Sequence, residues 1–543
     1  MPEQIGAGQG PPSKDPFDRR AFLRLAASGA GAVGLGAALT ACSSSSSTST
    51  STSTSTTSSP TSTTSPGTPK RGGLLTAGLG GGTSSDTLDA HGGVNTLDFG
   101  RLNQLYNCLV EYQADGLLRL ALAEEVTPSA KATTWTIRLR EGVEFHNGKS
   151  LTADDIVYNF RRITNPKKPF TGAALIPAIA DLKALDDRTV RIEFVSSFSP
   201  FYQMLAGYFY YIVPTGYDPA NPVGTGPFKF KSFNPGVQST FVRNENYWEP
   251  GLPYLDQVVM DDYNDETSQV NALISGQLQA IDQLSAASIQ TLTNGSQVVV
   301  VSDGGAYTPF TMRMDLAPFK DVRVRQAFKY IVNRPQLREQ VFLGHGLLGN
   351  DVFGINDPEY DRSIPQRVQD LDKARSLLKQ AGQEHLTVQL VTAPIAQGAV
   401  ESAQVFAQQA AAAGVTVTVR QTSSTVLYGS SYLQWLFSQD PWYGIYYLTG
   451  VAESQAPKAP INETHNRIPA YDKLYKEVLA TTDNALQTEL CHEMQMIEYD
   501  QGGYILPVFN PNIDAHSKTL AGVVPGRVGL SFGAYDFKHY WLT

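Results

Sequence analysis

Residues 135–163 read WTIRLREGVEFHNGKSLTADDIVYNFRRI, and this stretch decides how the chain around it folds. Its first six residues alternate between apolar and polar side chains, which predicts a half-buried strand over 135–140. Gly142 then turns the chain, and the pair Asn147-Gly148 is typical of a tight turn. Beyond the turn, apolar residues recur at helical spacing. The stretch therefore predicts a strand, a turn and a helix in succession.

Five side chains crowd this stretch and raise the hypothesis of a catalytic or metal site: Glu141, Glu144, His146, Asp154 and Asp155. Thr152 precedes Asp155 by three residues, which is the spacing of a capping box. The helix dipole stabilises carboxylates in the first turn, where Asp154 and Asp155 both lie. His146 adjoins the turn pair. We therefore interpret the cluster as structural.

The chain has 543 residues, a formal net charge of −9 and 41% hydrophobic residues. At about 150 residues per domain, this length predicts two or three lobes. No run of lysines and arginines with interleaved aromatic residues occurs, so nucleic-acid binding is not expected. The spacing of the three cysteines does not match a zinc site, and Cys108 and Cys491 pair only if the fold brings them together.

The N-terminus has the pattern of an export signal rather than of a domain. Arg19 and Arg20 precede a short, weakly apolar segment, which favours a twin-arginine signal peptide over 1–41. The segment ends in LTAC, which resembles a bacterial lipobox and predicts lipid on Cys42. Residues 42–70 are rich in Ser, Thr and Pro and predict a disordered linker. We expect an exported protein anchored to the outer face of the cell membrane.

Beyond residue 310 the predicted elements alternate between strand and helix. EHLTVQLVT and VTVTVRQT have the period of strands, whereas DLDKARSLLKQAG and AQVFAQQAAAAG have the pattern of helices. DVRVRQAFKYIVNRPQLREQVF carries apolar residues at helical steps. This alternation predicts α/β packing.

Several blocks together resemble the family 5 extracellular solute-binding proteins, which are receptors of ABC importers for peptides, nickel complexes and related solutes. They follow the family order along nearly the whole body of the chain: 135–163, PVGTGPFKFKSF with RNENYW (222–248), NALISGQLQAID (271–282), FKDVRVRQAFKYIVNR (319–334) and YILPVFN (504–510).

The resemblance implies an α/β fold of the periplasmic-binding-protein type, a large two-lobed clamp with mixed sheets and three subdomains. Lobe I would comprise 71–304 and 504–543, and lobe II would comprise 305–503. It also implies a monomeric receptor without a cofactor, with the permease and ATPase subunits of an importer as partners. Such a clamp encloses its ligand by hinge closure.

In peptide-binding members of the family, an aspartate after a tryptophan in lobe II receives the amino group of the peptide. The matching region here is LQWLFSQDPWYGIYYLTG, with Trp435. Three residues on stands Ser438, and Asp440 follows shortly after. Two alternatives remain open: Asp440 serves as the anchor, or the anchor is missing.

Other residues complete the candidate ligand site. Trp442 and Tyr443 belong to an aromatic cluster with Trp435, and aromatic walls suit apolar peptide side chains, sugar faces or planar ligands. Tyr307 and Arg313, just past the predicted crossover between lobes, are further candidates. No catalytic residue and no metal ligand is predicted.

Two motifs suggest an enzyme. GLSFG at 529–533 fits G-x-S-x-G, with Asp536 and His539 in hydrolase order, but too few residues follow to carry the partners on strands. His492-Glu493 lacks the second histidine of a zinc protease. His465, near the expected cleft, is a further candidate contact for a chelated metal.

The sequence thus predicts a lipid-anchored receptor, not an enzyme, that delivers a peptide or peptide-like solute to an ABC permease. The alternatives are a receptor of the same family for a metal complex or an oligosaccharide, a secreted hydrolase, and a non-transport role on the same fold.

Overall fold

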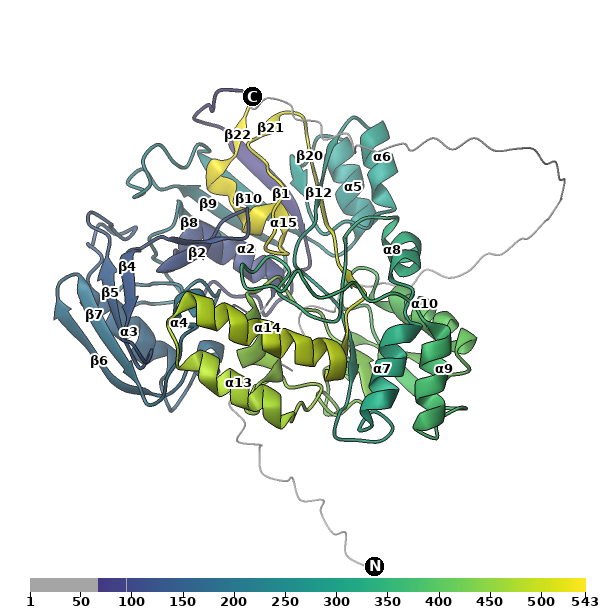
Figure 1. Cartoon of the computed structure of the whole chain (residues 1–543). Helices are drawn as coiled ribbons and strands as arrows, with labels where there is room; N and C mark the ends of the chain where they lie inside the picture. The colour runs from purple at the N-terminus through teal and green to yellow at the C-terminus, as the bar shows by residue number, and fades with distance from the viewer. Residues whose placement is uncertain (1–66, 94) are drawn as a thin grey trace, which may run out of the picture.

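The computed structural model describes residues 67–93 and 95–543, which three larger β-sheets organise (Figure 1). The largest has the strand order β12-β20-β11-β1-β10-β9-β8. It is mixed, because β1 runs parallel to β10 and β11 while the other neighbours are antiparallel. Its strands are β1 (Leu74–Gly80), β8 (Phe228–Asn234), β9 (Gln238–Arg243), β10 (Gln257–Tyr263), β11 (Ala280–Ile281), β12 (Val298–Ser302) and β20 (Asn512–His516). The accompanying helices are α2 (Thr96–Leu105), α5 (Glu266–Ile274), α6 (Ser288–Asn294) and α15 (Ser531–Tyr535).

The second sheet is antiparallel, has the order β4-β5-β7-β6, and contains the stretch at 135–163. Its elements are β4 (Ala123–Pro128), β5 (Thr134–Leu139), α3 (Ala153–Ile163), the 3₁₀ turn η1 (Thr171–Ala174), β6 (Ile179–Asp186), β7 (Thr189–Phe194) and α4 (Phe201–Met204). The predicted strand, turn and helix are confirmed as β5, the turn at Gly148 and α3. Alternate residues of β5 enter the core of this sheet, and α3 packs against β6 and β7.

Asp154 and Asp155 lie in the first turn of α3, as the sequence predicted. Thr152 and Asp155 form the capping box at the start of α3. Burial opposes ionisation of Asp155, but hydrogen bonds from Lys149, Thr215 and Thr152 outweigh it and lower the pKa of this carboxyl. His146 bonds through its ring to the backbone of Gly226 and so fixes the turn.

The third sheet has the order β16-β15-β17-β13-β18, formed by β13 (Phe310–Met312), β15 (Thr387–Thr392), β16 (Thr416–Gln421), β17 (Phe437–Gln439) and β18 (Tyr504–Ile505). The helical elements of this region are α7 (Val322–Ile331), α8 (Arg334–Phe342), α9 (Leu371–Gln380), α10 (Ala399–Ala412), α11 (Ser424–Leu427), α12 (Tyr447–Gly450), the π-helix η2 (Val451–Gln455), α13 (Pro469–Leu479) and α14 (Asn484–Gln501). The alternation predicted beyond residue 310 is present. The single helical pattern at 321–342 is split, because Asn333 caps a second helix with Pro335 in its first turn.

Three short strand pairs complete the described part of the chain: β2 (Val110–Tyr112) with β3 (Leu118–Leu120), β14 (Leu347–Leu348) with β19 (Val508–Phe509), and β21 (Leu520–Ala521) with β22 (Trp541–Leu542). A 3₁₀ turn, η3 (Phe537–His539), precedes β22.

The chain passes twice between the seven-stranded and the five-stranded sheet. The first passage leads from β12 to β13, and the second leads from β18 to β20. We refer to the seven- and four-stranded sheets with their helices as the first body, and to the five-stranded sheet with its helices as the second body. The lobe boundaries at 304 and 503 remain predictions, since sheet membership alone does not define a lobe.

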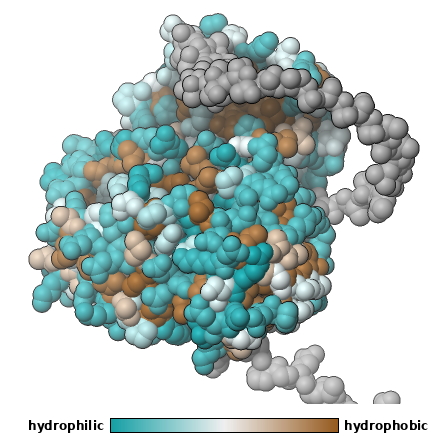
Figure 2. Space-filling model, turned by 45° about the vertical axis from the view of Figure 1, so that its right-hand side comes forward, coloured by the Kyte–Doolittle hydropathy of each residue, from teal (hydrophilic) through white to brown (hydrophobic). Residues whose placement is uncertain are grey.

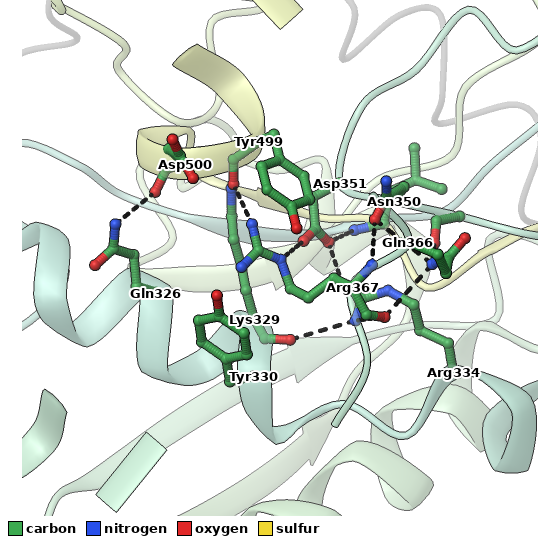
Figure 3. Close-up of polar contacts among 12 residues, drawn as sticks. Gln326, Lys329, Tyr330, Arg334, Asn350, Asp351, Gln366, Arg367, Tyr499 and Asp500 are labelled. Carbon is green, nitrogen blue, oxygen red and sulfur yellow. Dashed lines mark hydrogen bonds and ion pairs between the residues drawn. The ribbon is translucent and has the colours of Figure 1, made fainter. Parts of the chain in front are cut away.

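A buried ionic network ties helices of the second body together (Figure 3). The carboxylate of Asp351 accepts hydrogen bonds from Arg334 at 2.6 Å and Arg367 at 3.0 Å. Lys329, on α7, donates to the backbone carbonyls of Glu498 at 2.6 Å and Tyr499 at 2.9 Å, on α14. Burial lowers the pKa of Lys329 to about 7, and the charge of the nearby Asp351 carboxylate opposes this shift.

The face drawn in Figure 2 is mostly hydrophilic, and its hydrophobic residues lie in scattered groups, the broadest of them near the top of the view. Within 67–93 and 95–543, no helix combines the length and apolar character that crossing a membrane requires. Cys42, Arg19 and Arg20, the signal peptide and most of the linker lie outside the described residues.

Candidate ligand-binding site

Asp440 is the first residue after β17, the central strand of the five-stranded sheet. Its neighbours β15 and β13 run parallel and antiparallel to it. In α/β sheets, ligands bind beyond the carboxyl ends of the strands, and Asp440 stands at such an end. Only 2% of the residue is exposed to solvent.

Two tyrosines hold the Asp440 carboxylate in place. The hydroxyls of Tyr428 and Tyr432 donate to its two oxygens at 2.8 and 2.7 Å. The two rings pack edge to face with centroids 5.3 Å apart. Neither tyrosine was predicted from the sequence. The available signal was their spacing of four residues, just before Trp435.

A small pocket of about 10 Å³ adjoins Asp440, which is room for about one water molecule. Its lining residues are Leu427, Tyr432, Leu433, Trp435, Ser438, Gln439, Asp440 and Glu463. The structure thus brings Trp435 and Asp440 together. The Trp435 indole donates to the carbonyl of Leu427 at 2.8 Å, which fixes its ring at the pocket wall.

The pocket is acidic and polar. Two buried carboxylates, Asp440 and Glu463, line it, whereas its lining residues include no Lys, Arg or His. Glu463 accepts hydrogen bonds from Trp442 at 3.0 Å and from the hydroxyl of Tyr504 at 3.2 Å. No sequence pattern singled out Glu463, since it comes from an irregular segment far along the chain.

Trp442 and Tyr307 form part of a buried aromatic stack. Their rings are nearly parallel with centroids 6.5 Å apart, and Tyr307 stacks on Phe353 at 5.8 Å. The backbones of Tyr307 and Trp442 exchange hydrogen bonds of 2.9 and 2.8 Å. The stack therefore connects the first passage between the sheets to the segment that carries Asp440.

Tyr443 connects the second body to the first. Its hydroxyl lies 3.2 Å from the hydroxyl of Thr96, and its ring packs edge to face on Phe99 at 6.2 Å. Both partners belong to α2, in the first body. Close by, Tyr446 of the second body packs edge to face on Tyr112 at 5.7 Å. These contacts place aromatic rings from both bodies on either side of one interface.

Arg313 makes an internal ion pair. Its guanidinium donates twice to Asp315 at 2.8 Å and also bonds the carbonyl of Leu433 and the side chain of Gln434. The same guanidinium lowers the pKa of Asp315. Arg313 does not line the pocket beside Asp440, so the structure does not group it with Trp435 and Asp440.

The structure also shows the surroundings of the residues on which the enzyme and metal hypotheses rest. Ser531 is buried in α15, while His539 pairs with Asp536 at 2.5 Å. Cys108 and Cys491 are both buried and unpaired. Across the part of the chain that the structure covers, no cluster of three His, Cys, Asp or Glu is arranged to hold a metal ion. His465 bonds the carbonyl of Leu433.

Comparison with known proteins assigns the family. Residues 118–452 match the family model of bacterial extracellular solute-binding proteins, family 5, middle region. The glutathione-binding protein GsiB of Shigella flexneri is 28% identical over 491 residues, which cover 84% of this chain and 93% of GsiB.

Two solved structures share the fold. The periplasmic binding protein DppA from Helicobacter pylori, solved with the peptide STSA, superposes with a TM-score of 0.74 at 21% identity, covering 87% of this chain and 98% of DppA. NikZ from Campylobacter jejuni, solved with Ni(L-His), gives a TM-score of 0.74 at 16% identity over 86% and 99% of the two chains. The predicted two-lobed α/β fold is confirmed, and this chain belongs to the bacterial extracellular solute-binding proteins of family 5.

Proposed function

We propose that the protein captures a peptide or peptide-like solute through its free amino group, which the Asp440 carboxylate receives. The observation that carries this proposal is the acidic pocket, which two buried carboxylates, Asp440 and Glu463, line together. A buried carboxylate is best satisfied by a charged hydrogen-bond donor, and an ammonium group supplies three. The glutathione named for GsiB carries such an amino group.

The contacts between the two bodies support a receptor that encloses its solute. Tyr443, three residues after Asp440, reaches Thr96 across the interface, so the contact between the two bodies forms close in sequence to the proposed anchor. A transporter distinguishes a loaded receptor from an empty one by its closed state. We assign the permease and ATPase subunits of an ABC importer as partners, a monomeric state, and no catalytic step.

Export and anchoring belong to the same proposal. Arg19 and Arg20 direct export by the twin-arginine route, and lipid on Cys42 anchors the mature chain to the outer face of the membrane, with residues 42–70 as a tether. A Cys42→Ser variant that still partitions into membranes would contradict the anchor.

The cargo proposal is tested with an Asp440→Asn variant and isothermal titration calorimetry. Glutathione and a set of di- to tetrapeptides serve as ligands, and N-acetylated peptides serve as matched controls. Loss of a buried ammonium–carboxylate pair costs about 2 kcal/mol or more, so the variant is expected to bind amines about 30-fold more weakly or worse. Acetylation of the ligand should weaken binding to the wild type by a similar factor.

Full peptide affinity in the Asp440→Asn variant would refute Asp440 as the anchor. Stabilisation of the wild type by a nickel–histidine complex or an oligosaccharide, with no response to any peptide, would favour the alternative cargo classes.

A further inference from the structure

A second cavity lies in the first body and shares no lining residue with the pocket beside Asp440. Its volume is about 70 Å³, several times the ~10–15 Å³ that one water molecule needs. The end of α2, the segment leading into β2, the loop at 206–211 and the turn at 533–538 enclose it. Figure 1 shows α15, in yellow, against α2, in purple. None of the residues proposed to bind the cargo lines this cavity.

Two buried polar atoms at this cavity lack a hydrogen-bond partner among the described residues. The first is Oε1 of Gln104, a residue that is 1% exposed. Its amide nitrogen already donates to the carbonyls of Gly100 and Tyr535, so the side-chain orientation is fixed. The second is the hydroxyl of Tyr208. An unmade bond at a buried acceptor costs free energy, and a donor in the cavity would recover it.

The charge at the cavity favours a cation. Glu111 lines it, accepts one hydrogen bond from Asn107 at 2.7 Å, and lies 3.9 Å from the ammonium of Lys538. Lys538 is bonded more closely to a second carboxylate, that of Glu249. Since one lysine faces two glutamates, the cluster is short of positive charge. Burial raises the pKa of Glu111, although Lys538 and Asn107 oppose this shift.

We propose that this cavity is a second binding site, distinct from the pocket beside Asp440, which takes a small primary ammonium compound of a few non-hydrogen atoms. The ammonium group donates to Gln104 Oε1 and to the Glu111 carboxylate, and Tyr208 provides a further acceptor. A protonated amine supplies three donors and one positive charge, which are the two properties that the cavity lacks.

The test is calorimetric titration of the full chain with propylammonium chloride. Tetramethylammonium chloride, a cation without an N–H donor, and sodium chloride at equal ionic strength are the controls. The wild type is expected to bind propylammonium and neither control. A Glu111→Gln variant, which keeps the shape of the side chain, should bind it at least tenfold more weakly. The Asp440→Asn variant separates this site from the cleft, and it should retain propylammonium binding.

The outcomes are distinct for the two sites. Equal binding of propylammonium by wild type and Glu111→Gln would overturn the second site, as would binding that is lost only in Asp440→Asn. An equal response to tetramethylammonium would overturn the donor argument. Peptide affinity measured on the Glu111→Gln variant should match the wild type, so failure of the peptide proposal leaves this result unchanged. A Gln104→Leu variant with wild-type thermal stability and unaltered propylammonium affinity would remove Gln104 from the site.

Discussion

At the residue scale, buried carboxylates hold an unusual turn at the C-terminal end of the chain. Phe532, Ala534 and Tyr535 all have positive φ, a conformation that costs about 1 kcal/mol or more for a residue with a side chain. Asp514 accepts a hydrogen bond from the backbone of Phe532 at 2.7 Å, and Asp282 accepts one from the hydroxyl of Tyr535 at 2.8 Å. These bonds fix the left-handed turn in place.

Asp514 gives a pH-dependent prediction. Burial raises the pKa of Asp514 to about 7 from an unfolded value of about 3.9, so the folded state binds this proton more tightly. The stability contributed by this group therefore falls as pH rises from about 4 to about 7. An Asp514→Asn variant has no carboxyl group to titrate at this position. Its free energy of unfolding should therefore increase relative to that of wild type as pH rises through that range. Denaturant unfolding at several pH values measures the difference.

The control for this prediction is Asp372→Asn, because the Asp372 side chain is 97% exposed. Between pH 4 and 7, the difference in free energy of unfolding between this control and wild type should change less than the difference for Asp514→Asn. A pH-independent difference for Asp514→Asn as well would contradict the raised pKa.

At the element scale, the sequence predicts a helix correctly where the apolar pattern and the capping residues agree. Helix α3 begins after the predicted Thr152, because the capping box satisfies its first backbone donors through neighbouring residues alone. The region at 321–342 shows the opposite case. Its apolar period continues through Pro335, but a helix interior does not accept proline, so the chain makes two helices.

A Thr152→Ala variant tests the capping box. It loses the hydroxyl while Asp155 keeps its bond to the backbone of residue 152, so a loss of about 0.5–2 kcal/mol in the free energy of unfolding is expected. Thr152→Ser retains the hydroxyl and should lie within about 0.5 kcal/mol of wild type. Equal destabilisation by both substitutions would show that the methyl group matters, not the cap.

At the scale of the whole molecule, a polar contact joins the four-stranded sheet to helices of the second body. Ser199, just after β7, donates through its hydroxyl to the carbonyl of Val478 at 2.7 Å and accepts from Gln487 at 3.1 Å. Its backbone also donates to Leu479 at 3.0 Å. These residues lie on α13 and α14, so the contact exists only while the two bodies are close.

A Ser199→Ala variant is therefore expected to weaken closure. At about 0.5–1.5 kcal/mol for a hydrogen bond, cargo affinity should fall about two- to tenfold. Small-angle X-ray scattering of the variant at subsaturating cargo should show a larger radius of gyration than wild type. Ser196→Ala, at an exposed position of the same loop, is the control. Equal cargo affinities of the Ser199→Ala and Ser196→Ala variants would show that Ser199 does not contribute to closure.

The fold was more predictable than the site for a physical reason. Strands, turns and caps depend on neighbours in sequence, and the family blocks span the chain. The surroundings of Asp440 depend on groups that only folding brings together. Tyr428 and Tyr432 donate hydrogen bonds to its oxygens, and Glu463, which follows η2 in the chain, lines the same pocket. Whether Trp442, Tyr443, Tyr307 and Arg313 bind the ligand remains a prediction.

The position of β20 has a consequence for how the protein is made. This strand pairs with both β11 and β12, so it links two parts of the seven-stranded sheet. Until residues 512–516 leave the ribosome, the backbone groups of β11 and β12 that face it have no partner, and an unpaired strand edge invites misassociation. The first body therefore begins its largest sheet with β1 but completes it only after β20 has been made, and until then the edges of β11 and β12 stay open to misassociation.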